Sequence, residues 1–149
     1  MSTWNCSAVI PMILLDANVI LDVWEPDPVW QAWSSSQMRN LSLLHELAIN
    51  PIVYSEISVS FATPAALDEK LADLGVVVEG IPRPAAFLAG KAYVQYRRKG
   101  GTKSNVLSDF FIGAHAAVVG CALLTRDTRR YAAYFPGVRL IAPPSHLVK

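Results

Sequence analysis

The stretch MILLDANVIL, residues 12–21, sets the pattern from which the fold is predicted. Its opening apolar run ends abruptly at Asp16, and the apolar pattern resumes directly after Asn18. A short all-apolar run bounded by a polar residue is typical of a buried strand, and the residues that follow it have the pattern of a helix. A carboxylate at the end of such a strand can belong to a solvent-exposed turn, a helix cap or a metal site. Which of these applies depends on where the other acidic residues lie.

Length and composition indicate a single well-buried domain. The chain has 149 residues, of which 52% are hydrophobic and 17% charged, and this excludes a disordered chain. No apolar run reaches the roughly 18 residues that a membrane span requires, and residues 1–12 lack the basic start and cleavage site of a signal peptide. Cys6 and Cys121 have no CxxC spacing, so we expect neither a disulfide scaffold nor a zinc site. We therefore expect a cytoplasmic protein, with residues 1–12 as an N-terminal extension and residues 13–149 as one domain.

Apolar segments of strand length alternate with helical patterns along the chain. The expected strands are residues 12–15, 45–50, 76–80, 121–125 and 138–143. The best-marked helix lies between them, with Thr63 as its cap, Pro64 at its first position and Gly75 at its end. Apolar strands that alternate with helices predict a parallel sheet covered by helices on both faces. The predicted fold is an α/β three-layer α/β/α sandwich with a parallel five-stranded sheet, in an order that this pattern leaves open.

Four acidic residues fall where the ends of these strands are expected. Asp16 directly follows the first strand, and Glu56 lies in the first turns of the helix after the second. Asp109 opens the long apolar helix that leads to the fourth strand, and Asp127 comes just after that strand in LLTRD. In open α/β sheets, ligands bind beyond the carboxyl ends of the strands. We therefore expect the four carboxylates to meet at one edge of the sheet.

Each of these acids also has a purely structural interpretation. Asp16 and Asp127 can cap the helices that follow them, and Asp109 can complement a helix dipole. Glu56 can be a solvated residue on the face of a helix. These interpretations do not explain why acids recur at several strand ends of an apolar chain, beside segments as hydrophobic as FFIG.

A shared cation site would explain the recurrence. Clustered carboxylates raise one another's pKa values unless a cation neutralises them. Hard divalent ions such as Mg²⁺ or Mn²⁺ take oxygen ligands, and a bound water then becomes a nucleophile near neutral pH. We expect Asn18 and Thr125 to orient the carboxylates through hydrogen bonds.

The segments LLDANVIL, INPIVYSEIS, LSDFFIGAHA and LLTRDTRRYAAYFPGVRLI together resemble the PIN-domain nucleases, and among them the VapC-type toxins of bacterial toxin–antitoxin pairs. The resemblance runs from about Ile13 to the C-terminus and leaves out the N-terminal extension. It implies a metal-dependent endoribonuclease of α/β/α fold with Asp16, Glu56, Asp109 and Asp127 as the catalytic, metal-binding acids and Thr125 as a supporting hydroxyl. It also implies Mg²⁺ or Mn²⁺ as cofactor, an RNA substrate, a cognate antitoxin that blocks the site, and a homodimer.

Basic residues around the acids are candidates for binding RNA phosphates. The net charge is only +1, but setting the four acids aside leaves an excess of five positive charges on the rest of the chain, which suits a phosphate backbone. The candidates are Arg97, Arg98, Lys99, Lys103, Arg126, Arg129 and Arg130. For residues 97–99 the alternative is that basic residues simply suit the C-terminus of a helix.

Three further features of the chain bear on its function. Trp24, Trp30 and Trp33 lie beside the polar run SSSQ and are either core residues or an interface for a second copy or an antitoxin. His115, on the apolar helix, is expected to be a buried histidine. The segment GGTKS, residues 100–104, lacks the spacing of a phosphate-binding P-loop and does not follow a strand, so it is set aside.

Other classes of protein remain as alternatives. A signalling receiver domain also binds Mg²⁺ at the edge of a parallel sheet, but it needs an aspartate after the third strand, where this chain has Glu79. A PIN nuclease of RNA processing, or a PIN domain that has lost catalysis and only binds, would share the fold. The complete set of four acids speaks against the inactive form.

Overall fold

The strands form one sheet whose order the chain pattern alone could not give. The computed structural model describes residues 11–25 and 27–144. Its strands are β1 (Met12–Leu15), β2 (Glu46–Ile49), β3 (Val76–Val78), β4 (Ala122–Leu124) and β5 (Leu140–Ile141). They lie in the order β3-β2-β1-β4-β5, and every neighbouring pair is parallel. The prediction of a five-stranded parallel sheet is confirmed.

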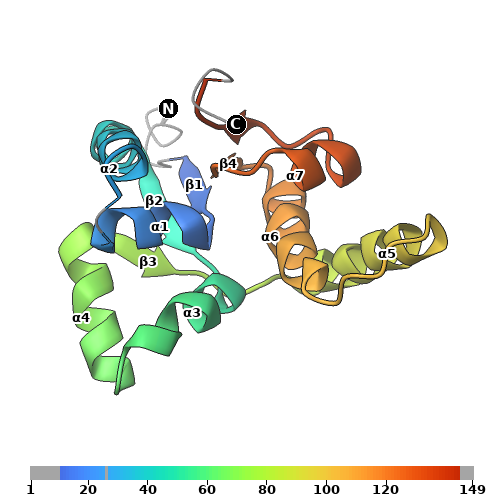
Figure 1. Ribbon diagram of the computed structural model, residues 1–149, viewed down its shortest axis with the longest axis horizontal. Helices are drawn as coiled ribbons and strands as arrows, with labels where there is room; N and C mark the ends of the chain where they lie inside the picture. Colours follow the sequence, from blue (N-terminus) through green and yellow to red (C-terminus); the bar gives the residue numbers. More distant parts are fainter. Residues whose placement is uncertain (1–10, 26, 145–149) are drawn as a thin grey trace, which may run out of the picture.

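Helices cover both faces of this sheet. They are α1 (Ala17–Trp24), α2 (Trp30–Leu41), α3 (Pro51–Ile57), α4 (Pro64–Leu74), α5 (Arg83–Arg98), α6 (Val106–Val119) and α7 (Arg129–Tyr134). Figure 1 shows α1, α2 and α4 on one side and α5, α6 and α7 on the other. The chain crosses the sheet in one direction from β1 to β3 and returns in the other direction to β4 and β5. Because such crossovers are right-handed, the two directions place their helices on opposite faces, and the three-layer sandwich follows.

Local signals account for the helix ends. The Thr63 side chain accepts a hydrogen bond from the backbone N–H of Ala66 at 3.2 Å, and Gly75 ends α4 with a φ of 72°. At α3, Pro51 holds the first position, and the helix tightens into a 3₁₀ turn at Ser58–Ser60. These are ordinary capping devices that satisfy backbone groups at helix ends.

A buried polar pair joins the helices that carry two of the candidate acids. Asn50 caps α3, because its Oδ1 accepts from the backbone N–H groups of Ile52 and Val53, both at 3.0 Å. Its Nδ2 lies 3.3 Å from Nδ1 of His115 on α6. His115 is only 1% exposed, so the prediction of a buried histidine is confirmed. Burial lowers the pKa of His115, which favours the neutral ring that this contact needs.

The strands are added to the sheet in one direction from β1 to β3 and in the opposite direction from β4 to β5, and β1 and β4 are neighbours where this order reverses. Leu15 pairs with Leu124, so the residues that follow the two strands emerge side by side. The backbone N–H of Asp16 donates to the carbonyl of Leu124 at 3.0 Å and closes this edge. Open α/β sheets bind ligands at the carboxyl ends of strands beside such a reversal.

Two further expectations concern the ends of the chain and the membrane. Met12 is the first residue of β1, and residues 1–10 lie outside the described part, so the N-terminal extension stays a prediction. Among the described residues, none of the helices has both the length and the apolar character needed to span a membrane.

Candidate active site

Asp16 is the centre of a hydrogen-bond network at this edge. The residue is 6% exposed, and its Oδ1 accepts from the backbone N–H of Ala17 at 2.8 Å. Its Oδ2 accepts from the hydroxyls of Thr125 at 2.8 Å and Tyr131 at 2.9 Å. Asp16 therefore caps α1, as the structural alternative proposed, and also has its second oxygen fixed by two hydroxyl groups. Burial raises the pKa of Asp16, and the two hydroxyls oppose that rise.

Tyr131 is a site residue that sequence reasoning missed. It lies on α7, is 2% exposed, and has a pKa raised well above its ordinary value by burial and by the nearby Asp16. It therefore remains protonated and serves as a fixed donor. The available signal was weak, because an aromatic residue at helical spacing in RRYAAYF has the pattern of ordinary core.

Glu56 on α3 contributes a second, poorly solvated carboxyl group. Its Oε1 is buried and has no hydrogen-bond partner among the described residues. Burial raises the pKa of Glu56 from 4.5 to about 7, with further contributions from the charges of Asp16 and Asp109. A buried oxygen without a partner is costly, and it commonly marks a place that an ion or water fills.

Asp109 and Asp127 approach from the other side of the sheet. Asp109 lies in the first turn of α6, as predicted, and forms an ion pair with Arg130 of α7. Burial raises the pKa of Asp109, with Arg130 opposing the rise and Asp127 adding to it. Asp127 is exposed, and its Oδ1 accepts from the backbone N–H of Arg129 at 3.2 Å, the local contact that its structural alternative proposed. Its own N–H donates to the Thr125 hydroxyl oxygen at 3.0 Å.

The four predicted acids therefore lie at one edge: the charges of Asp16, Glu56 and Asp109 act on one another, and Asp127 acts on Asp109. As placed, no three carboxylate, imidazole or thiol groups of the described residues converge into a closed metal chelate, and Asp109 is engaged by Arg130. The donor set nevertheless fits a hard divalent cation. It consists of oxygens alone, it includes the unpartnered Oε1 of Glu56, and its mutual repulsion is what a cation would offset.

Asn18 lies between the two strand ends. Its Nδ2 is 3.5 Å from Oδ2 of Asp16, and its Oδ1 accepts from the backbone N–H of Arg126 at 3.3 Å. The side chain thus links the start of α1 to the loop after β4, which carries Thr125 and Asp127. This is the geometry expected of a residue that orients the acids.

The side chain of Arg126 does not face the acids. Its Nε and Nη2 donate to the two carboxylate oxygens of Asp22 at 2.7 and 2.9 Å, and the guanidinium lies 4.8 Å from the ring centre of Trp30. Asp22 is 5% exposed and also accepts from the Ser34 hydroxyl at 2.7 Å. RNA binding by Arg126 stays a prediction; in the structure its bidentate pair with Asp22 ties the loop after β4 to α1. Sequence reasoning missed Asp22, because its partner is 104 residues away in the chain.

The other basic candidates divide into two groups. Lys103, Arg129 and Arg130 line one cavity together with Asp127. Arg97, Arg98 and Lys99 lie exposed at the C-terminal end of α5, where the dipole interpretation also applies. The structure therefore brings only the first group to the acidic edge.

A parallel sheet with four carboxylates at the edge where its strand order reverses defines an α/β protein with a candidate cation site. Comparison with known proteins identifies its family. Residues 13–136 match the family model of the PIN domain, and the chain belongs to this family. It is 29% identical over 143 residues to the VapC ribonuclease Y4jK of Sinorhizobium fredii, covering 89% of this chain and 97% of that protein.

Solved structures show the same fold. The crystal structure of VapBC2 from Rickettsia felis, bound to a DNA fragment from its promoter, matches with a TM-score of 0.67 and 20% identity. That match covers 89% of this chain and 99% of the other. VapBC-1 from nontypeable Haemophilus influenzae matches with a TM-score of 0.66 and 19% identity, covering 88% and 97% of the two chains.

Proposed function

We propose that this protein is a cytoplasmic, divalent-metal-dependent endoribonuclease that acts as the toxin of a toxin–antitoxin pair. The observation that carries the proposal is that four acids lie at the carboxyl edge of the sheet near β1 and β4, with one buried carboxylate oxygen that has no hydrogen-bond partner among the described residues. The similarity to a protein named VapC ribonuclease supports the choice of RNA as substrate. The solved VapBC relatives support an antitoxin as partner.

In this proposal Asp16, Glu56, Asp109 and Asp127 hold Mg²⁺ or Mn²⁺. Bound there, the cation supplies Lewis acidity that activates water and offsets charge on a phosphoryl group. The chain itself supplies the fixed frame. The Thr125 and Tyr131 hydroxyls hold one oxygen of Asp16 in place, and the Ala17 N–H holds the other. Such positioning keeps the carboxylate from reorienting when charge develops on the substrate.

Arg130 has two roles in this proposal, one toward Asp109 and one toward the substrate. Its guanidinium neutralises Asp109 in the structure, and it lies on the side of the site that Asp127 also borders. A cation bound by the acids would compete for Asp109 and leave the guanidinium available to a phosphate, which Arg binds well through its planar donors.

The chemical ends of the cleaved RNA would show whether water or the RNA itself is the nucleophile. Attack by water leaves a 5′-phosphate and a 3′-hydroxyl on the cleaved RNA. A 2′,3′-cyclic phosphate would instead show attack by the RNA's own 2′-hydroxyl, and would contradict this mechanism.

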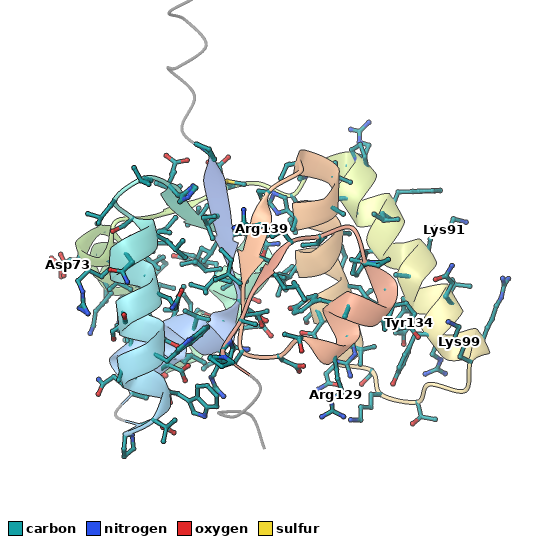
Figure 2. All side chains as sticks on the ribbon, turned by 90° about the horizontal axis from the view of Figure 1, so that it is seen from above. Asp73, Lys91, Lys99, Arg129, Tyr134 and Arg139 are labelled. Carbon is teal, nitrogen blue, oxygen red and sulfur yellow. The ribbon has the colours of Figure 1, made fainter. Side chains whose placement is uncertain are left out.

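The test is cleavage of RNA by the purified protein with Mg²⁺ or Mn²⁺, with and without a chelator. Asp109→Asn keeps the shape of the side chain and removes its charge, and should abolish cleavage. Asp73→Asn is the matched control, because Asp73 lies on α4, on the far side of the molecule from α7 (Figure 2). If Asp109→Asn cleaves as well as the wild type, any activity comes from another site or a contaminant, and the proposal fails.

The partner surface is the second part of the proposal. Trp30 and Trp33 pack edge to face with ring centres 6.4 Å apart, and both are half-buried. Because Trp30 also covers Arg126, Trp33→Ala is the cleaner change for testing an antitoxin or homodimer contact. We expect weaker partner binding with metal binding unchanged, and unchanged partner affinity would remove this surface from the proposal. A neighbouring gene for a small DNA-binding protein would favour the toxin over a nuclease of RNA processing.

A further inference from the structure

The GGTKS segment, residues 100–104, borders a cavity beside the acids. The segment joins α5 to α6, and Lys103 lines a cavity of about 310 Å³. The remaining lining residues are Tyr96, Asp127, Arg129, Arg130 and Tyr134. The segment is not a P-loop, as its spacing indicated. It nevertheless presents a lysine next to one of the four acids.

The loop is fixed against Tyr96 through its backbone. A Cβ at Gly101 would lie 2.3 Å from the Tyr96 ring, so only glycine allows this approach. The N–H of Gly101 donates to the Tyr96 carbonyl at 2.9 Å, and the N–H of Lys103 donates to the Tyr96 hydroxyl at 3.0 Å. Gly100 makes the preceding turn with a φ of 91°. The backbone at Lys103 is therefore fixed by contacts that do not use its ammonium group.

The cavity carries positive charge that the described residues do not neutralise. Lys103 and Arg129 form no ion pair with any described residue, and the guanidinium of Arg130 is paired with Asp109. Asp127 is the only acid in the lining, against three cations. The ammonium of Lys99 lies 5.4 Å from the ring centre of Tyr134 and adds a further positive charge at this end. Figure 2 shows Tyr134 of α7 beside Lys99 at the end of α5.

The cavity also adjoins the acidic site. Asp127 lines the cavity and is one of the four acids, while Arg130 lines it and binds Asp109. An anion held by Lys103 and Arg129 would thus sit next to any group bound at the acids. A nucleic-acid backbone is a chain of regularly spaced anions, and it satisfies both places at once.

We propose that this cavity is a subsite for one backbone phosphate of single-stranded RNA, adjacent to the phosphate at the acids, and held by Lys103 and Arg129. The proposal rests on the proposed ribonuclease function, because it names how that substrate is held. The polar lining and the cationic side chains of the cavity suit a phosphate better than a base. Both tyrosine rings of the lining are already in contact with other groups, Tyr96 with Gly101 and with neighbouring aromatic rings, and Tyr134 with Lys99 and Phe110, which leaves little room for a base to stack.

The test measures binding without cleavage. Short oligouridylates, each with a different single phosphate replaced by a neutral methylphosphonate, are titrated against the protein in EDTA. We expect one replacement to weaken binding by the wild type and to have little further effect on Lys103→Gln or Arg129→Gln. These two variants should also reduce the slope of log affinity against log salt by about 0.7 for each lost contact. Lys91→Gln is the matched control, because Lys91 lies nearer the start of α5, away from the cavity (Figure 2).

Two outcomes would overturn the subsite. One is that both variants bind the unmodified oligomer as tightly as the wild type does. The other is that every methylphosphonate weakens the variants as much as it weakens the wild type. Failure of the proposed function looks different: a phosphate coupled to Lys103 would be found in EDTA, but no RNA would be cleaved when metal is added.

Discussion

The buried oxygen of Glu56 leads to a measurable dependence of stability on pH. A carboxyl whose pKa is higher in the folded protein than in the unfolded chain stabilises the fold when protonated, and this stability is lost as pH rises through the folded pKa. For Glu56 the window runs from 4.5 to about 7. Glu56→Gln keeps the shape of a protonated carboxyl and cannot ionise. We therefore expect the variant to lose less stability than the wild type across this window.

The magnitude follows from the size of the change in pKa. A rise from 4.5 to about 7 corresponds to about 3.4 kcal/mol at full strength. Because the side chain is half-buried, solvent screening reduces this to about 1–2 kcal/mol. The assay is urea unfolding at about pH 5 and about pH 8 in EDTA, followed by tryptophan fluorescence. The quantity compared is the loss of unfolding free energy between the two pH values, in the wild type and in Glu56→Gln.

A matched control and a metal titration complete the experiment. Glu69 is exposed on α4, and Glu69→Gln should lose as much stability as the wild type. At the higher pH, added Mg²⁺ should stabilise the wild type more than Glu56→Gln, because a ligand that binds only the folded state raises its stability. If Glu56→Gln loses as much stability with pH as the wild type does, the burial of this carboxyl does not govern its ionisation and the reasoning is wrong.

Four other substitutions, one of them a control, test the frame around the site. Tyr131→Phe removes the hydrogen bond to the buried Asp16 carboxylate and should cost about 1–2 kcal/mol of stability. It should also weaken Mg²⁺ binding, measured by calorimetry. Unaltered Mg²⁺ affinity would show that Tyr131 does not position Asp16 for the metal. Gly113→Ala places a Cβ 2.4 Å from the ring of Phe135 and should destabilise by about 1–3 kcal/mol in thermal unfolding. Gly90→Ala, with open space around its helical position, should instead stabilise slightly, and equal effects at the two glycines would contradict the packing argument. Arg126→Ala should cost about 2–3 kcal/mol in urea unfolding, because it leaves a buried carboxylate unpaired. If Arg126→Ala lost RNA binding but kept normal stability, Arg126 would be an RNA-binding residue and not a structural one.

Features that depend on short stretches of chain could be predicted from the sequence. The strand that ends at Asp16, the capped helix after Thr63 and the five parallel strands all follow from local pattern and composition. The gathering of four acids at one edge follows from the geometry of parallel sheets, in which the carboxyl ends of all strands share a side. No knowledge of which strands are neighbours is needed for that expectation.

Features that depend on tertiary contacts could not be predicted. Strand order is invisible when every strand is an apolar run, since any order buries the same residues. The ion pair between Asp22 and Arg126 and the bond between Tyr131 and Asp16 join residues more than 100 positions apart. Both pairs look like ordinary charged and core positions until the fold brings them together, and so two positioning contacts of the site escaped sequence reasoning.

The hydroxyls that hold Asp16 have a consequence for the timing of synthesis. They belong to residues 109 and 115 positions further along the chain. A ribosome synthesises Asp16 more than 100 residues before these partners, so a nascent chain that still lacks them cannot build the network. Translation interrupted before β4 would release a fragment without an organised acidic centre.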